Sequence, residues 1–124
     1  MNEHLISEAE ELRLGGHALQ LLPQEDGWIF VVFEQYPLPE GFSHDSTPLL
    51  IKVPPNYPLG GLDMFWMNSQ LILASGALPA NTSVEHCLGA PWLRFSWHPL
   101  KWNPSSDSLT SYLKFINSRL EKRQ

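Results

Sequence analysis

The stretch at residues 49–67, LLIKVPPNYPLGGLDMFWM, limits the fold of this chain more than any other. An apolar run, a Pro-Pro-Asn-Tyr-Pro corner and a second apolar run follow one another there. Proline fixes φ and cannot donate to a sheet ladder, whereas the flanking residues favour a pleated, half-buried surface. The stretch therefore predicts two neighbouring strands that are held at a rigid bend.

The segment before this corner predicts one helix and two more strands. Apolar residues at helical spacing indicate an N-terminal helix over residues 3–14, which Asn2 can cap and a Gly-Gly pair can end. Apolar runs at residues 17–23 and 28–36 are typical of strands. Because short loops connect these strands to the pair at the corner, we expect a four-stranded antiparallel meander.

The segment after the corner, residues 68–105, lacks a sustained period and is rich in Pro, Gly, Ser, Asn and Trp. A structureless segment of that length is more often functional than idle, so we expect a long functional loop. Four aromatic side chains are expected to pack this loop down: Trp92, Phe95, Trp97 and Trp102.

The end of the chain predicts a C-terminal helix. Its cap is expected at Ser105 or Ser106, with Asp107 in the first turn. One face carries an apolar stripe: Leu109, Tyr112, Leu113, Ile116 and Leu120. The order of helix, strands, long loop and helix is α+β, and residues 1–124 are expected to form a single domain.

Charge and composition limit the partners. A formal net charge of −5, with only 8 Lys and Arg, argues against a basic surface that follows a phosphate backbone. No apolar run approaches the roughly 18–20 residues of a membrane span, and the acidic N-terminus differs from a secretory signal. We therefore expect a cytoplasmic protein that binds neither nucleic acid nor membrane. A single cysteine allows no internal disulfide, which fits a reducing compartment.

Cys87, in the segment VEHCLGAPW, is the first candidate for chemistry, because a thiolate is the best nucleophile among the side chains. His86 precedes it directly, although adjacent side chains often point apart. His98 follows in the segment RFSWHP and could fold back as a base or an orienting group. The alternatives are a packing cysteine and a histidine satisfied by a backbone carbonyl. The scattered histidines predict no metal site, and no phosphate-binding loop is visible.

Three segments together resemble ubiquitin-conjugating (UBC) enzymes and, within that superfamily, prokaryotic family E. LLIKVPPNYPLGGLDMFW is similar to their third strand, Tyr-Pro corner and fourth strand. HCL is similar to their active-site cysteine and the leucine after it, and KWNPSSDSLTSYLKFI to their Trp-x-Pro segment and next helix. The resemblance spans about residues 1–123 and implies a UBC-like fold in which the long loop after the corner is the active-site loop.

The resemblance also implies a function. Cys87 would carry a ubiquitin-like protein as a thioester and transfer it to a target, without a cofactor. The implied partners are the ubiquitin-like protein, a ThiF-like activating enzyme and a JAB-type peptidase, in a bacterial pathway whose expected setting is antiphage defence.

The His-Pro-Asn motif that precedes the cysteine of conjugating enzymes is missing from this chain. Asn81 and Asn68 are the candidates to support the oxyanion in its place, and His98 lies in an insertion from which it could supply part of the function. Two other interpretations stay open. One is an inactive UBC-like or RWD-like scaffold that binds the same partners, and the other is a small-ligand binder that uses the tryptophan-rich loop.

Overall fold

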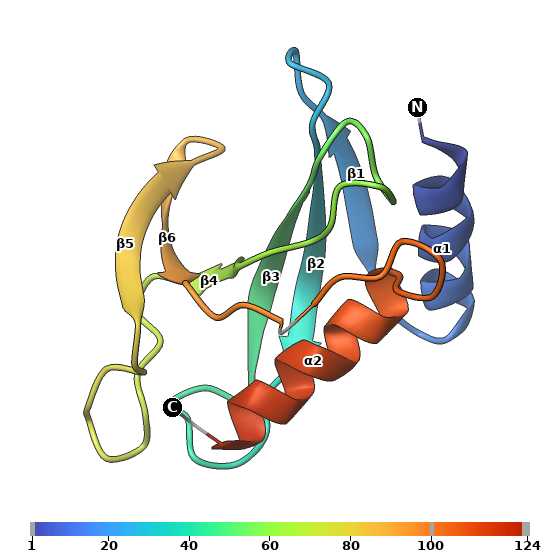
Figure 1. Cartoon of the computed structure of the whole chain (residues 1–124). Coiled ribbons are helices and arrows are strands. Elements are labelled where there is room, and N and C mark those ends of the chain that lie inside the picture. The colour runs from blue at the N-terminus through green and yellow to red at the C-terminus, as the bar shows by residue number, and fades with distance from the viewer. Residues whose placement is uncertain (1, 100, 123–124) are drawn as a thin grey trace.

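A computed structural model describes residues 2–99 and 101–122, which form one sheet and two helices (Figure 1). The elements follow in the order α1 (Glu3–Leu14), β1 (Leu19–Pro23), β2 (Ile29–Pro37), β3 (Ser46–Val53), β4 (Phe65–Asn68), β5 (Thr82–Cys87), β6 (Ala90–Phe95) and α2 (Leu109–Lys122). Neither helix in this part of the chain has the length and apolar character that crossing a membrane requires.

The sheet has six antiparallel strands in the order β1-β2-β3-β4-β6-β5. Its first four strands are the four that the sequence predicts. The expected long loop, however, contains a hairpin, and β6 pairs with β4 so that β5 becomes the outer strand (Figure 1). The prediction of a UBC-like four-stranded meander with a long active-site loop is therefore wrong, although the class is still α+β.

The hairpin was hard to predict because its turn lacks the usual sequence signal. Leu88 and Gly89 form the turn between β5 and β6, and both have positive φ, 52° and 74°. Turns of this kind normally carry Asn-Gly or Asp-Gly, since a leucine rarely adopts positive φ. β5 itself, TSVEHC, is partly exposed and mostly polar, so it lacks the apolar alternation that marks a strand.

Helix α1 confirms its prediction at both ends. The side chain of Asn2 accepts a hydrogen bond from the backbone N–H of Leu5 at 3.1 Å, and Gly15 forms the C-terminal cap. Three side chains of α1 are buried: Leu5, Ala9 and Leu12.

Helix α2 begins later than its prediction. Ser108, and not Ser105 or Ser106, caps the first turn, because Ser108 and Ser111 exchange backbone-to-hydroxyl hydrogen bonds of 2.9 and 3.2 Å. Asp107 therefore precedes the helix, where it accepts a hydrogen bond from the hydroxyl of Ser111. The predicted apolar stripe is buried in full: Leu109, Tyr112, Leu113, Ile116 and Leu120.

The proline corner ties both helices to the sheet. The hydroxyl of Tyr57 donates to Glu8 Oε1 on α1 at 2.6 Å, and the same oxygen accepts from the backbone N–H of Leu109 at the start of α2, at 2.8 Å. The indole N–H of Trp102 donates to the carbonyl of Pro58 at 2.8 Å. The corner is therefore a junction of three elements as well as a bend between two strands.

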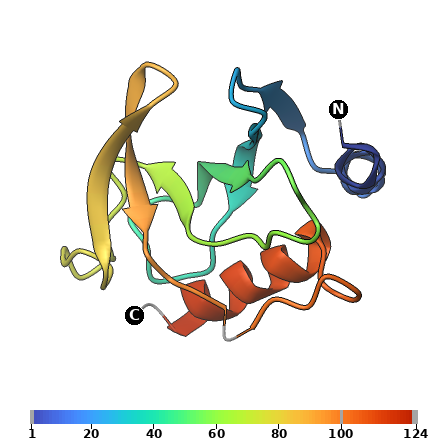
Figure 2. The same cartoon turned by 45° about the horizontal axis from the view of Figure 1, so that its top comes forward.

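The two faces of the sheet differ. The hydrophobic core lies between one face and α2, which crosses that face (Figure 2). Side chains alternate along a strand, so Ile51 and Phe65 point into this core while Leu50 and Trp66 point to the other face. No helix in the described part of the chain covers that second face, which we call the open face (Figure 2).

Two of the aromatic residues that were expected to pack the loop down, Phe95 and Trp97, lie in the hydrophobic core. Phe95 stacks on Phe65 with ring centroids 4.7 Å apart, and the edge of Trp97 meets both rings. Trp97 is almost fully buried, and its indole N–H donates to the carbonyl of Ala80 at 2.7 Å. These contacts fix the chain that leaves β6 on the α2 side of the sheet.

Candidate functional site

Cys87 is the last residue of β5 and pairs with Ala90 across the hairpin turn. Its side chain is partly exposed, and its carbonyl accepts a hydrogen bond from the indole N–H of Trp92 at 3.0 Å. Side chains two residues apart on a strand share a face, so Cys87 stands on the same face as Glu85. Glu85 contacts Lys52 and Trp66, and the thiol therefore lies at the rim of the open face.

Glu85 is the centre of a network that crosses four strands on the open face. One carboxylate oxygen accepts from Lys52 Nζ at 3.0 Å and from the indole N–H of Trp66 at 3.2 Å, and the other pairs with Arg94 at 2.9 Å. The ammonium of Lys52 lies over the ring of Trp66, 4.2 Å from its centroid. Hydrogen bonding from Lys52 is the main reason that the pKa of Glu85 is lowered.

This network sets the charge environment of the thiol. Burial raises the pKa of Cys87 above its ordinary value, the positive charge of Lys52 lowers it, and the negative charge of Glu85 raises it again. The net effect is a raised pKa, so the thiol is mostly protonated near neutral pH. A nucleophilic Cys87 would thus need a base, or a change in the balance between Lys52 and Glu85.

A pocket of about 350 Å³ opens on the same face, beside the network. Its walls combine aromatic, charged and small residues: Trp28, Lys52, Gly61, Asp63, Met64, Trp66, Glu85 and Arg94. The Nε atom of Arg94 is buried and has no hydrogen-bond partner among the described residues. This mixture of aromatic and charged walls suits a ligand that presents an apolar group beside a polar or charged one.

His98 and Asn81 lie at the other end of the hairpin from Cys87. Phe95, the last residue of β6, pairs with Thr82, the first of β5, and His98 follows shortly after it. Six residues of extended strand separate these ends by roughly 17 Å. In this structure the two predicted helpers are therefore not assembled around the thiol.

Each of these two residues has a local contact of its own. The ring of His98 contacts the carboxylate of Asp63, and both side chains are about half exposed. Asn81 has positive φ, and its carbonyl accepts from the backbone N–H of Ser96 at 3.0 Å. Asparagine tolerates positive φ better than most residues, which is a structural reason for its presence there.

The other two residues singled out by sequence lie at the thiol's end of the hairpin. His86 is exposed, but alternation along β5 directs its side chain to the opposite face from Cys87. Asn68, at the end of β4, lines a pocket of about 290 Å³ together with Ala90, the residue that pairs with Cys87. Of the two asparagines left open by the sequence, Asn68 is the one at the end of the sheet that holds the thiol.

Four residues of this site are not predicted from the sequence: Lys52, Trp66, Glu85 and Arg94. They come from β3, β4, β5 and β6, so they meet only when these four strands assemble into the sheet. The one local signal was a lysine within the apolar run LLIKV, which alternation would place on the face opposite the core.

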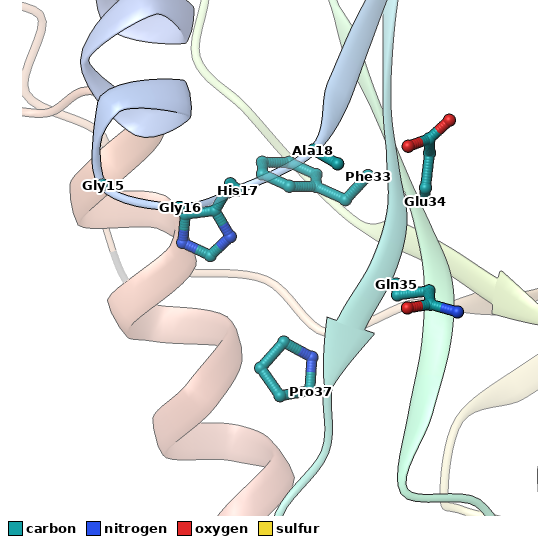
Figure 3. A pocket seen from close by; sticks show the side chains of 8 residues that line it. All are labelled: Gly15, Gly16, His17, Ala18, Phe33, Glu34, Gln35 and Pro37. Carbon is teal, nitrogen blue, oxygen red and sulfur yellow. The ribbon is translucent and has the colours of Figure 1, made fainter.

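A third pocket, of about 550 Å³, lies where α1 leads into β1 and does not include the thiol (Figure 3). Within it His17 stacks on Tyr36 and meets the edge of Phe33, with ring centroids 6.0 and 5.5 Å apart. The carboxylate of Glu34 lies on the far side of the β2 ribbon from this histidine (Figure 3). His17 is thus engaged in packing against Phe33 and Tyr36.

The described residues, 2–99 and 101–122, contain no group of three or more His, Cys, Asp or Glu side chains arranged to hold a metal ion. The residues around Cys87 offer the chemistry of a thiol beside an ion-pair network.

The fold and this site define an α+β domain with a single thiol at the end of an outer hairpin. A family model described as prokaryotic E2 family E matches residues 10–123. The chain therefore belongs to prokaryotic E2 family E, a family of proteins similar to ubiquitin-conjugating enzymes. Searches of curated proteins and of solved structures gave no significant match.

Proposed function

We propose that this protein accepts the C-terminal carboxyl group of a ubiquitin-like protein as a thioester on Cys87 and passes it to a target. The observation that carries the proposal is the position of Cys87, in a member of prokaryotic E2 family E, at a partly exposed turn next to the open face. A thioester keeps the acyl group activated while the carrier moves between partners.

The first step is an exchange between two sulfur atoms. The thiolate of Cys87 attacks the carbonyl carbon of a thioester held by an activating enzyme, and a new S–C bond forms as the old one breaks. The cysteine of the activating enzyme leaves as a thiolate and takes up a proton. In the second step an amine of the target attacks the same carbon, the bond to Cys87 breaks, and the amine loses a proton as the thiol is restored.

The residues around Cys87 suggest how these steps are assisted. Lys52 stabilises negative charge at the thiol and Glu85 opposes it, so a partner that draws Glu85 away would favour the thiolate. Asn68 is the better-placed donor for the oxyanion in this conformation, because it lies at the thiol's end of the sheet. Roles for Asn81 and His98 would require the ends of the hairpin to approach one another.

The proposal includes the partners of the pathway. A ThiF-like enzyme would activate the ubiquitin-like protein, and a JAB-type peptidase would remove it from targets. The expected setting is the bacterial cytoplasm, in a system that defends against phage.

The test is a reaction with the cognate activating enzyme, the ubiquitin-like protein and ATP, separated on gels with and without reductant. The wild type should give an adduct that reductant removes, whereas Cys87→Ser should give none that reductant removes. The proposal fails if the wild type forms no such adduct, or if Cys87→Ser forms the same one.

A second candidate, a non-catalytic scaffold for the same partners, is favoured by the raised pKa of Cys87. It is also favoured by the separation of His98 and Asn81 from the thiol. The rate at which iodoacetamide alkylates native Cys87 separates the two, because a thiol that only packs reacts far more slowly than a free thiol. Slow alkylation that the activating enzyme does not accelerate would support the scaffold.

A further inference from the structure

The outer strand β5 ends the sheet without a cover. At the other end of the sheet α1 lies beside β1, whereas no helix or strand of the described residues flanks the outer side of β5 (Figure 2). An uncovered outer strand presents unpaired N–H and C=O groups in an ordered row. Such a row is a template on which an extended chain can add as another strand.

The hairpin geometry fixes which groups of β5 face outward. The two-residue turn makes Cys87 and Ala90 a hydrogen-bonded pair, and such pairs alternate along an antiparallel ladder. At the far end of the hairpin the N–H of Ser96 donates to the carbonyl of Asn81 at 3.0 Å, so Asn81, an even number of residues before Cys87, also bonds towards β6. Ser83 and Glu85 therefore bond to β6, so that the backbone groups of the residues between and after them, Val84 and His86, face outward.

This edge has little of the usual protection against pairing. Natural outer strands are commonly blunted by proline, by charged side chains or by a bulge. β5 has the sequence TSVEHC and a regular register with β6, and Val84 is 59% exposed. Its one carboxylate, that of Glu85, is held on the open face by Lys52 and Arg94, so the edge itself is open to a backbone partner.

The direction of β5 determines what kind of chain would suit it. β5 runs towards Cys87 and ends there. A chain that pairs in parallel with β5 also ends at Cys87 with its own C-terminus, and its last residue needs only to turn onto the open face to meet the thiol. A reactant whose C-terminal carboxyl carbon must reach Cys87 therefore matches this edge in direction.

We propose that the extended C-terminal tail of the ubiquitin-like protein binds as a parallel strand along the outer edge of β5, paired with the backbone of Val84 and His86. This inference rests on the proposed function for the identity of the occupant. Main-chain hydrogen bonds supply the affinity, and the strand direction delivers the tail's last residue to Cys87.

Hydrogen exchange tests the docking without any thioester chemistry. The probe is the ubiquitin-like protein that the cognate activating enzyme adenylates, added without ATP to ¹⁵N-labelled protein at saturation. The amides of Val84 and His86 should become protected, whereas those of Ser83 and Glu85, already bonded to β6, should change little. A ubiquitin-like protein shortened by its tail is the control and should protect neither.

Two variants at one position test the role of the backbone. Val84→Pro removes an outward N–H and leaves the ladder to β6 intact, and proline is tolerated on outer strands. It should weaken binding of the ubiquitin-like protein about tenfold, because the partner's carbonyl is left unpaired. Val84→Ala keeps the N–H and should bind within about twofold of wild type, since only an exposed side chain is lost. Alkylation of Cys87 should be unchanged in both.

The outcomes separate this inference from the proposed function. If a thioester forms on Cys87 while the amides of Val84 and His86 exchange as in the free protein, the edge proposal is wrong and the carrier function stands. If these amides are protected but no thioester forms, the docking stands and the carrier function is wrong. Equal binding by Val84→Pro and Val84→Ala would also overturn the edge proposal.

Discussion

Glu8 is the side chain whose removal should do most to loosen the junction of α1, the proline corner and α2. Its Oε1 atom accepts two hydrogen bonds, from the hydroxyl of Tyr57 at 2.6 Å and from the backbone N–H of Leu109 at 2.8 Å. Hydrogen bonds to a charged group contribute about 1.5–3 kcal/mol each, and those that share an acceptor are not additive. Glu8→Ala should therefore lower the free energy of unfolding by about 2–4 kcal/mol.

Glu8→Gln is the matched variant. Its amide oxygen can accept from both Tyr57 and Leu109, but without the charge each bond is worth about 0.5–1.5 kcal/mol. The loss should then be roughly half that of Glu8→Ala. Urea unfolding followed by tryptophan fluorescence measures both, with an unchanged m-value expected if only stability changes. The reasoning is refuted if Glu8→Ala unfolds within about 0.5 kcal/mol of wild type, or if the two variants are equally unstable.

Four further predictions concern the corner and the thiol. Gly61→Ala should lower the free energy of unfolding in urea by about 1–3 kcal/mol, because the added Cβ would lie 2.5 Å from an indole carbon of Trp102. Gly15→Ala is the control and should be nearly neutral, since its Cβ would meet nothing closer than 3.5 Å. Glu85→Gln should speed the alkylation of Cys87 severalfold, because the carboxylate raises the pKa of that thiol; unchanged rates would exclude the coupling. As the pH falls below 4.5, the free energy of unfolding of the same variant should fall less than that of wild type. The lowered pKa of the Glu85 carboxyl stabilises the folded state at pH values above 4.5, and this contribution is lost as the carboxylate takes up a proton. His98→Gln should leave the alkylation rate of Cys87 unchanged, and a slowed rate would show that the ends of the hairpin meet.

Much of the fold could be predicted because its signals are local. Asn2 and the Gly-Gly pair mark the ends of α1, and the apolar runs before and within the proline corner mark the first four strands. The spacing of apolar residues identified the buried face of α2, although its first turn depends on Ser108, which exchanges bonds with a side chain one turn away.

The hairpin could not be predicted in the same way. Leu88 at positive φ gives no turn signal, and β5 has little burial to impose an alternating pattern. Its place in the sheet is set by contacts distant in sequence, such as those of Phe95 with Phe65 and Trp97.

The candidate site, like the fold, could be predicted from the sequence only in part. Cys87 could be identified from its residue type and from the segment HCL, whereas the residues that control it depend on strand order. Lys52 and Glu85 are 33 positions apart in the chain and lie on β3 and β5, so their ion pair depends on how the strands are arranged in the sheet. Their positions near Cys87 in the sequence made Asn81 and His98 candidates to assist the thiol. A loop could have brought them close to Cys87, whereas the extended hairpin holds them at its opposite end.

The carrier function of Cys87 is best tested by the mass of the protein after reaction with the activating enzyme, the ubiquitin-like protein and ATP. If Cys87 carries the thioester, the mass rises by that of the ubiquitin-like protein less one water, and the increase lies on the peptide that contains Cys87 and is released by hydroxylamine. No increase, or an increase on another residue that persists in Cys87→Ser, would rule this function out.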